Sequence, residues 1–357
     1  LQGTFYNGSL GGNINVGYVL YAGGRIGISK DLLKVATTQE ILNKNITINN
    51  LITNIYQQYY YVLLQKEQQK VIDYTFSLSA DRLAYERTKA EFGATNSFNL
   101  IQFENATVSD SINLINQNQQ IKIAERQLYT ILGISNNQSY TYPESLNVQL
   151  EDIDPDKLTN SLKENNYTLK SLDILASLNR LNTALAKSAN KPTIALNGSL
   201  GAAENAFKFF ADDPNTGEPY PLIFSNRFTG GIGAQLNWNI YDGGVRRVDI
   251  ENAQIQESID QLTIDEAKVN IKNQLADLID NYNNQKDVLA LTQRQIQIAN
   301  SNIEISEERF KGGQLTSIDF RNAQIQYLNA AYIRVNAIYR LIVTKSEIDN
   351  LVGRFVE

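Results

Sequence analysis

Two glycine pairs have the residue type and position at which a chain could bind a ligand. Gly23-Gly24 and Gly243-Gly244 each end an alternating strand pattern and precede a long helical pattern, and backbone amides at such a junction can cradle a phosphate. Neither pair belongs to a GxGxxG or GxxxxGK[ST] sequence, which phosphate binding would require. We therefore predict that both pairs are tight hinges between strand and helix, because glycine adopts the backbone angles that such turns need.

Asp319 is the carboxylate with the most defined position in the sequence. It follows Thr316 at the spacing of a capping box, just after Gly312-Gly313, which suit the end of a helix. An acid in the first turn of a helix offsets the helix dipole and contributes about 0.3–1 kcal/mol at an exposed site. The pattern predicts a helix–turn–helix at this point.

The sequence contains no recognisable catalytic set. It has no Cys and no His, which removes thiol nucleophiles, Cys/His metal sites and His acid–base pairs. Carboxylates such as Glu307 and Glu308 are typical of a solvated helix face. The run Tyr59-Tyr60-Tyr61 could stack bases or sugars, but successive helical residues point about 100° apart, so we expect it to pack against neighbouring helices. We expect no enzymatic activity, no metal and no cofactor.

The net charge and the hydropathy pattern limit which partners and which kind of membrane contact the protein can have. The net charge is −6, with 32 basic and 38 acidic residues well mixed, so we expect no nucleic-acid partner. With 42% hydrophobic residues, a chain of 357 residues can bury a core. No run approaches 18 apolar residues. If the chain meets a membrane, strands must therefore span it.

The element that leads into the second glycine pair is an alternating pattern over residues 231–241. Its length fits a membrane-spanning strand, which needs about 9–11 residues. One face is apolar and the other polar, so we predict that the apolar face meets lipid. The apolar face carries Ile232, Ala234, Leu236, Trp238 and Ile240, and the polar face carries Gly233, Gln235, Asn237 and Asn239.

Two further strand patterns run from Ile14 to Leu20 and onward from Pro192, which suits the start of a strand. Residues 1–10 are typical of the end of a loop. Residues 204–229 are typical of a polar loop, with strong turn chemistry in their middle. A strand, a long loop and a strand are typical of an outward-facing hairpin of a membrane barrel.

The chain contains an internal two-fold sequence repeat with an offset of 220 residues. Three landmarks share that offset, which makes duplication the firmest inference from the sequence. Tyr18 and Trp238 hold the same strand position in the two copies, as aromatic residues at a membrane interface would. We predict a first repeat over residues 1–150 and a second over residues 151–357. The landmarks are Tyr21-Ala22-Gly23-Gly24 with Tyr241-Asp242-Gly243-Gly244, Gly93 with Gly313, and Leu132-Gly133 with Val352-Gly353.

Very long helices are predicted between these landmarks, where the pattern is helical and without proline. Gly24 to Gly93 and Gly244 to Gly313 each span 69 residues, so each helix would approach 100 Å at about 1.5 Å per residue. From Ser97 and from Ser317 the chain returns for only 36 residues. Such lengths predict a coiled or barrel-like helical assembly.

A further helical pattern over residues 156–190 follows a linker from Ser135 to Pro155 and would complete the first return. By the repeat, a matching helix and one more strand should lie before residue 1. We therefore expect upstream residues to be missing from this chain.

These features together resemble the outer-membrane efflux channel (TolC-like) family. The motifs that carry the resemblance are Tyr241-Asp242-Gly243-Gly244-Val245-Arg246 after a strand, the run from Arg309 to Asp319 at a helical turn, and their first-copy counterparts. The resemblance covers essentially the whole chain. It implies a mixed α and β membrane protein. In that family a homotrimer forms a twelve-helix α-helical barrel and a twelve-stranded β-barrel completed by strands from three protomers.

The resemblance also implies sites. The two helical turns form an ordinary helix–turn–helix each, and the resemblance adds that they would be the periplasmic tip where an adaptor protein docks. Asp319 and its first-copy match Asn99 would lie at the pore entrance, where three copies of an acid favour cations; Leu315 stands where some relatives place a basic gating residue. The turn residues are Gly93, Ala94, Thr95, Asn96, Ser97, Gly312, Gly313, Gln314, Leu315, Thr316 and Ser317.

The expected function is the exit duct of a tripartite efflux or type I secretion system. The duct would lie in the outer membrane of a Gram-negative bacterium, in contact with its lipid, and extend into the periplasm. A periplasmic adaptor and an inner-membrane RND or ABC pump would supply the substrate. The alternative is a coiled-coil structural or adhesion protein without a pore, which would not need alternating strands with matched aromatic residues.

Overall fold

The computed structural model describes residues 4–135, 140–213 and 215–355. The chain divides into two compact units. The strand unit comprises residues 1–40 and 172–265, and the helical unit comprises residues 41–171 and 266–357. Two long helices, α1 (Arg25–Glu91) and α5 (Val245–Lys311), contribute residues to both units.

The strand unit contains an antiparallel sheet in the order β1-β2-β3. Its strands are β1 (Phe5–Ala22), β2 (Thr193–Phe209) and β3 (Ile223–Asn237). The register aligns apolar positions across the sheet: Val16 faces Gly198, which faces Ile232. The other face is rich in Asn, Gln, Ser and Thr. The predicted amphipathic strands are therefore present, with Ile232 91% exposed on the apolar side.

The strands are longer than the sequence patterns predicted. Residues 5–10, assigned to a loop, lie in β1, and both ends of the predicted loop 204–229 are paired as strand, for example Glu204 with Asn226. Cross-strand backbone pairing outweighs the loop-like Asn, Ser and charged residues of these stretches, whose aromatic residues favour strand. The connection between β2 and β3 is confined to residues 210–222, of which residue 214 lies outside the described part.

β3 also ends earlier than predicted, at Asn237 rather than at residue 241. The residues that follow β3 form hydrogen bonds outside the sheet. The Trp238 Nε1–H donates to the Asn190 carbonyl at 3.2 Å, and the Asn239 carbonyl accepts from the Arg246 guanidinium. These bonds turn the chain out of the sheet toward α5.

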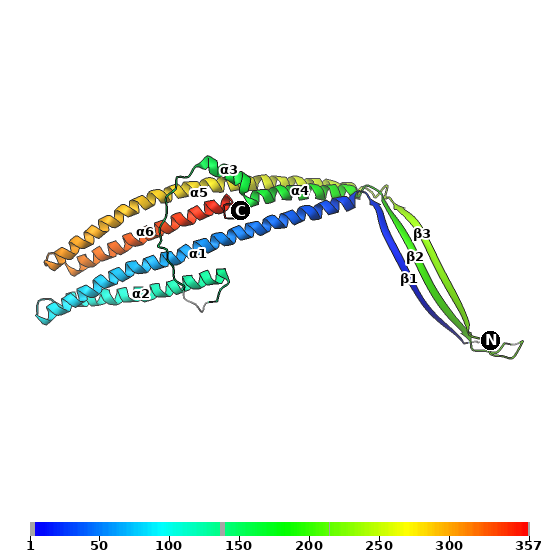
Figure 1. Cartoon of the computed structure of the whole chain (residues 1–357), viewed down its shortest axis with the longest axis horizontal. Helices are drawn as coiled ribbons and strands as arrows, with labels where there is room; N and C mark the ends of the chain where they lie inside the picture. The colour runs from blue at the N-terminus through cyan, green and yellow to red at the C-terminus, as the bar shows by residue number, and fades with distance from the viewer. Residues whose placement is uncertain (1–3, 136–139, 214, 356–357) are drawn as a thin grey trace. The chain divides into compact units, whose positions relative to one another are not determined.

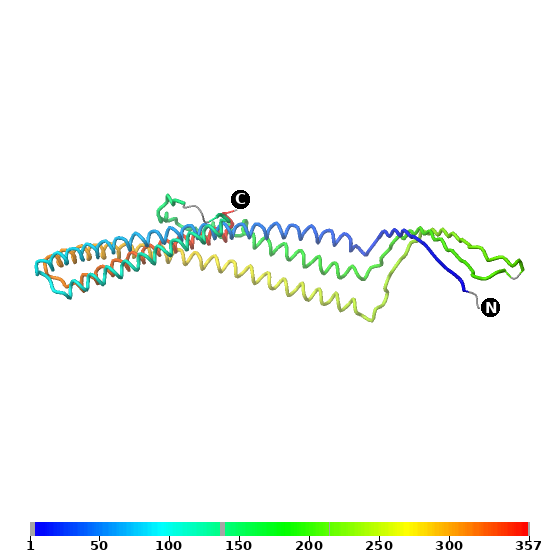
Figure 2. The backbone as a smooth tube through the Cα atoms, turned by 90° about the horizontal axis from the view of Figure 1, so that it is seen from below, coloured from blue at the N-terminus to red at the C-terminus, as the bar shows by residue number. Residues whose placement is uncertain are grey.

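The long helices and the 220-residue repeat are confirmed. α1 and α5 each contain 67 residues and begin 220 residues apart. The return helices α2 (Ser97–Leu132) and α6 (Ser317–Leu351) also begin 220 residues apart. Figures 1 and 2 show the α1–α2 turn and the α5–α6 turn at the same end of the helical unit. No helix in the described part of the chain has an apolar stretch long enough to cross a membrane.

The predicted helix over residues 156–190 is two helices, α3 (Pro155–Asn165) and α4 (Tyr167–Ser188). Asn166 separates them: its backbone is extended, its amide donates to the Leu351 carbonyl at 2.7 Å, and its Oδ1 accepts from the Leu169 amide at 2.6 Å. The side chain that caps α4 thus breaks the helix. Part of the predicted linker, residues 136–139, lies outside the described residues.

The core of the helical unit holds α3 against the long helices. Leu158 and Leu162 of α3 pack with residues of α5 and α6, among them Tyr282 and Leu341. The three consecutive tyrosines of α1 are partly buried and pack against a second cluster, which includes Leu63 and Ile338. Tyr61 lies 5.8 Å from Tyr339 between ring centroids. The structure therefore confirms that the Tyr59-Tyr60-Tyr61 run packs against neighbouring elements.

Candidate functional site

The two helical turns are built by the same local chemistry. Gly93 and Gly313 adopt φ of +64° and +73°, the left-handed conformation that ends a helix with little strain only for glycine. After each glycine a side chain caps the next helix. The Asn96 Oδ1 accepts from the Asn99 amide at 2.9 Å, and the Thr316 Oγ1 accepts from the Asp319 amide at 3.2 Å.

Asp319 forms one half of the capping box that its spacing predicts, because its backbone amide is capped by Thr316 while its own side chain bonds the Thr316 hydroxyl. The Thr316 hydroxyl donates to the Asp319 Oδ2 at 2.6 Å, and both side chains are exposed. This geometry places a negative charge in the first turn of α6, where it offsets the helix dipole. The role of Asp319 at a pore entrance stays a prediction.

Asn99, the first-copy counterpart of Asp319, has a different partner. The Ser317 hydroxyl donates to the Asn99 Oδ1 at 3.0 Å. Ser317 is buried at the start of α6, whereas Asn99 lies at the start of α2. The structure thus joins the two predicted turns by a side-chain hydrogen bond.

An aromatic cluster fills the space between the two turns. The Phe103 and Phe310 rings lie 5.3 Å apart, and the Phe310 and Phe320 rings lie 5.5 Å apart. Leu83 belongs to the same buried cluster, and Leu315 packs against it. Leu315 therefore serves the packing of the turn, which explains an apolar residue at this position.

A buried charge network, which the sequence patterns did not reveal, lies next to this cluster. The Arg321 Nη2 and Nη1 atoms contact the Asp110 Oδ1 and Oδ2 atoms at 2.6 and 2.7 Å. The Ser79 hydroxyl also donates to the Asp110 Oδ2 at 2.6 Å. Asp110 is 2% exposed. One carboxylate therefore links α1, α2 and α6.

A second ion pair links α1 to α5. The buried Arg82 guanidinium pairs with Glu307, and the Glu307 carboxylate also accepts from the Lys311 Nζ at 2.9 Å. The hydrogen bond from Lys311 and the nearby Arg82 charge lower the pKa of Glu307. The prediction that Glu307 is a solvated charge is therefore wrong, because its partner Arg82 comes from a distant helix; Glu308 is exposed.

The four hinge glycines lie between strand and helix with positive φ. The values are +65° for Gly23, +86° for Gly24, +71° for Gly243 and +91° for Gly244. Asp242 supports the second hinge. Its Oδ1 accepts from the Gly244 amide at 3.1 Å and its Oδ2 from the Arg246 Nε at 2.6 Å. The Arg246 side chain lowers the pKa of the Asp242 carboxyl.

The two hinges differ in how closely other atoms of the protein approach their first glycine. A Cβ on Gly23 would lie 2.6 Å from the Ser188 carbonyl oxygen, whereas a Cβ on Gly243 would have nothing within 4 Å. We expect Gly243→Ala to cost about 1–2 kcal/mol, the strain of left-handed alanine. Gly23→Ala should cost about 2–5 kcal/mol, because overpacking adds to that strain. Denaturant unfolding of both purified variants measures the difference, and equal losses would contradict this account of the hinge.

The two predicted interface aromatics do not occupy matched places in the sheet. Tyr18 lies within β1 opposite Leu196, whereas Trp238 lies one residue beyond β3. Both side chains are exposed, at 66% and 54%. Contact with a membrane interface stays a prediction for both residues.

Comparison with known proteins finds a protein family whose model matches this chain and solved structures that share its fold. A family model described as outer membrane efflux protein matches residues 158–354. The structure of the outer membrane protein VceC of Vibrio cholerae is similar with a TM-score of 0.78 at 14% identity, over 98% of this chain and 87% of VceC. The CmeC outer membrane channel of Campylobacter jejuni gives 0.78 at 16% identity, over 99% and 78%.

The MtrE outer membrane channel of Neisseria gonorrhoeae, in an open state, gives a TM-score of 0.76 at 13% identity, over 99% of this chain and 81% of MtrE. No curated protein sequence matches the chain. At these identities the solved structures establish a shared fold.

Proposed function

The chain belongs to the outer membrane efflux protein family, whose model matches more than half of it, and from this premise we propose how it forms a duct. The family places it in the outer membrane of a Gram-negative bacterium, as the exit duct of an efflux system. Its members are transport channels. We infer that this chain, too, moves substrates without converting them.

The observation that carries the proposal is the open three-stranded sheet. In the described residues, β1 and β3 pair only with β2, so each leaves one long edge without a partner. Unpaired edges are not tolerated within the hydrocarbon of a bilayer, where the backbone must be satisfied by a helix or a closed barrel. We propose that three copies close the sheet into one β-barrel and the long helices into one α-helical barrel.

The two faces of the sheet support this arrangement. The apolar face, with Ile14, Leu200 and Ile232, would meet lipid, and the polar face, with Asn15, Asn197 and Gln235, would line the lumen. We propose that transport through such a lumen is passive. A periplasmic adaptor and an inner-membrane pump would deliver the substrate; the choice between small-molecule efflux and protein secretion depends on that pump.

The turns at the end of the helical unit are the proposed periplasmic entrance and adaptor contact. They comprise residues 93–97 and 312–317. The Asp110–Arg321 and Arg82–Glu307 pairs and the Asn99–Ser317 hydrogen bond hold the two hairpins together. We propose that this end is narrow in the resting channel and opens when the hairpins separate.

A ring of three Asp319 carboxylates at this entrance would favour cations. We expect Asp319→Asn to lower the K⁺/Cl⁻ permeability ratio about two- to fivefold, because the charge is lost while an oxygen that can accept from the Thr316 hydroxyl is retained. The reversal potential in a KCl gradient measures this ratio. Asp156→Asn, which removes an exposed acid at the start of α3, is the control. Equal ratios in Asp319→Asn and the native channel would exclude Asp319 from the entrance.

Single-channel recording tests the duct itself. Purified protein in a planar bilayer should give discrete conductance steps, and variants that loosen the turns should raise the mean current. Asp110→Asn weakens the Asp110–Arg321 pair and is one such variant. A bilayer that remains silent with the native chain, Asp319→Ala and Asp110→Asn would contradict the proposal.

A further inference from the structure

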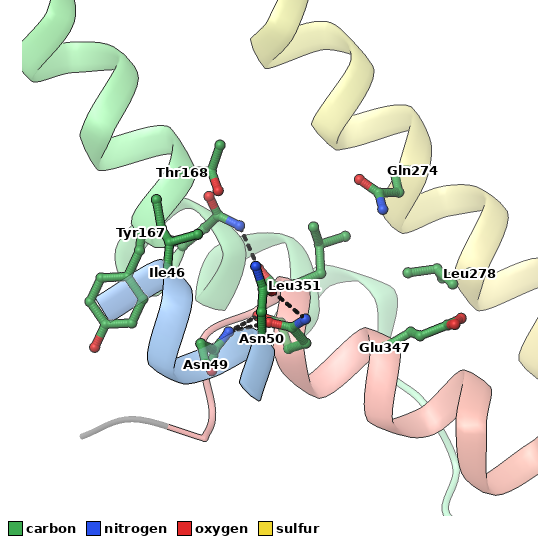
Figure 3. A pocket seen from close by; sticks show the side chains of 11 residues that line it. Ile46, Asn49, Asn50, Tyr167, Thr168, Gln274, Leu278, Glu347 and Leu351 are labelled. Carbon is green, nitrogen blue, oxygen red and sulfur yellow. Dashed lines mark hydrogen bonds between the residues drawn. The ribbon is translucent and has the colours of Figure 1, made fainter. Parts of the chain in front are cut away.

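The helical unit contains a polar cavity that the duct does not explain. Its volume is about 410 Å³, and residues of α1, α4, α5 and α6 line it. Figure 3 shows Gln274, Leu278 and Glu347 across from Asn49 and the start of α4. The full lining is Ile46, Asn49, Asn50, Asn166, Tyr167, Thr168, Gln274, Leu278, Glu347, Asn350 and Leu351.

The wall on the α1 side is fixed by amide hydrogen bonds. The Asn49 amide donates to the Asn350 carbonyl at 2.8 Å, and the Asn350 amide donates to the Asn50 Oδ1 at 3.1 Å. The Asn166 amide donates to the Leu351 carbonyl at 2.7 Å. These hydrogen bonds use the side-chain N–H groups of Asn49, Asn350 and Asn166 as donors. The Asn49 Oδ1, on a side chain only 5% exposed, has no donor within the described part of the chain.

Glu347 is the one charged side chain among the described residues that line this cavity. Two cations close to Glu347 in the sequence pair with other acids: the Lys345 Nζ lies 3.0 Å from Asp349 and 3.3 Å from Glu151, and Arg354 also pairs with Asp349. No ion pair joins Glu347 to a cation within the described residues. Burial raises the pKa of Glu347, as expected for a carboxylate that lacks a counter-charge.

We propose that this cavity binds a small organic cation with a primary ammonium group, which pairs with the Glu347 carboxylate and donates its remaining hydrogens to amide oxygens of the lining. An ammonium supplies three donors and a positive charge, and among the described residues the lining has one buried amide oxygen without a donor, the Asn49 Oδ1, and the Glu347 carboxylate without an ion-pair partner. An anion would meet Glu347 unfavourably. A neutral alcohol would leave the carboxylate without its counter-charge.

The cavity accommodates a short alkylammonium, whose apolar stem can lie along Leu278 and Ile46. The site is separate from the helical turns, the proposed lumen entrance near Asp319. Its occupation would bring together α1, α4 and α6 through one ligand. The proposal does not depend on the duct, because binding is measured without transport.

Calorimetric titration of the full-length purified protein with n-butylammonium chloride tests the site. We expect saturable binding that weakens at least tenfold in Glu347→Gln, which preserves the shape of the side chain and removes the charge. Glu266→Gln, an exposed acid of α5, is the matched control and should bind like the native chain. n-Butanol and tetramethylammonium should bind weakly, because the first lacks charge and the second lacks N–H donors.

Several outcomes would overturn the proposal. Equal binding in the native chain and in Glu347→Gln would assign the cation to other acids, such as those at the turns. Equal binding of n-butanol would make the cavity a neutral polar site. Thermal unfolding of Glu347→Gln shows whether this variant is folded, and a structure at saturating n-butylammonium that contains only water in the cavity would also reject the site.

Discussion

Asp110→Ala should lower the free energy of unfolding by about 3–5 kcal/mol. The change leaves the Arg321 guanidinium without its carboxylate partner, and an unpaired charge in a mostly buried place is costly. It also removes the acceptor of the Ser79 hydroxyl. Denaturant unfolding in detergent, followed by helical circular dichroism, measures the loss. Because the carboxylate links three helices, the same variant should raise the mean channel current.

Asp73→Ala is the control for this variant, because Asp73 is an exposed acid on α1 and should change stability by less than about 0.5 kcal/mol. The double variant Asp110→Leu with Arg321→Met should recover most of the lost stability, since it removes both charges together. Similar losses in Asp110→Ala and Asp73→Ala would show that the network contributes little to holding the hairpins.

Phe320→Ala is the second change with a large expected effect. Phe320 is fully buried in the aromatic cluster between the two turns, against the Phe310 ring. Truncation of a buried phenylalanine costs about 3–5 kcal/mol, because contacts are lost and a cavity remains. The melting temperature of the purified variant should fall accordingly.

Phe98→Ala provides the comparison, because Phe98 lies in the first turn of α2, next to the α1–α2 turn, and is 54% exposed. We expect it to change the stability of the isolated chain by less than about 1 kcal/mol. If the two variants melted alike, the cluster of Phe103, Phe310 and Phe320 would not be the structural core of the turns.

Most of the helical framework could be predicted because its signals are local and occur twice. Glycine at positions 23, 93 and 133 and at the positions 220 residues later marks helix ends, and the structure gives each of them positive φ. The α3–α4 break was missed because it depends on Asn166, whose amide reaches the Leu351 carbonyl of another helix. A hydrogen bond between residues 185 positions apart does not change the hydrophobic pattern of the sequence around Asn166.

At the strand ends the error is the opposite one: β1, β2 and the start of β3 are longer than predicted, whereas the helix over residues 156–190 was predicted too long. Residues 5–10 and 204–209 contain Asn7, Gly8 and Asn205, which are typical of loops, and the pairing of β1 with β2 shows that both stretches are strand. The turns were located from their capping residues, which are also local. The Asp110–Arg321 pair could not be foreseen, because its members lie 211 residues apart and each resembles an ordinary charge on a helix.

Imaging of the purified protein in lipid nanodiscs by electron microscopy tests the central claim most directly. We predict a particle with threefold symmetry in which the strands of three copies close one barrel in the lipid. A continuous lumen should run from that barrel through the helices to the turns. A monomeric particle with an open sheet, or a trimer with a solid helical core, would contradict the account.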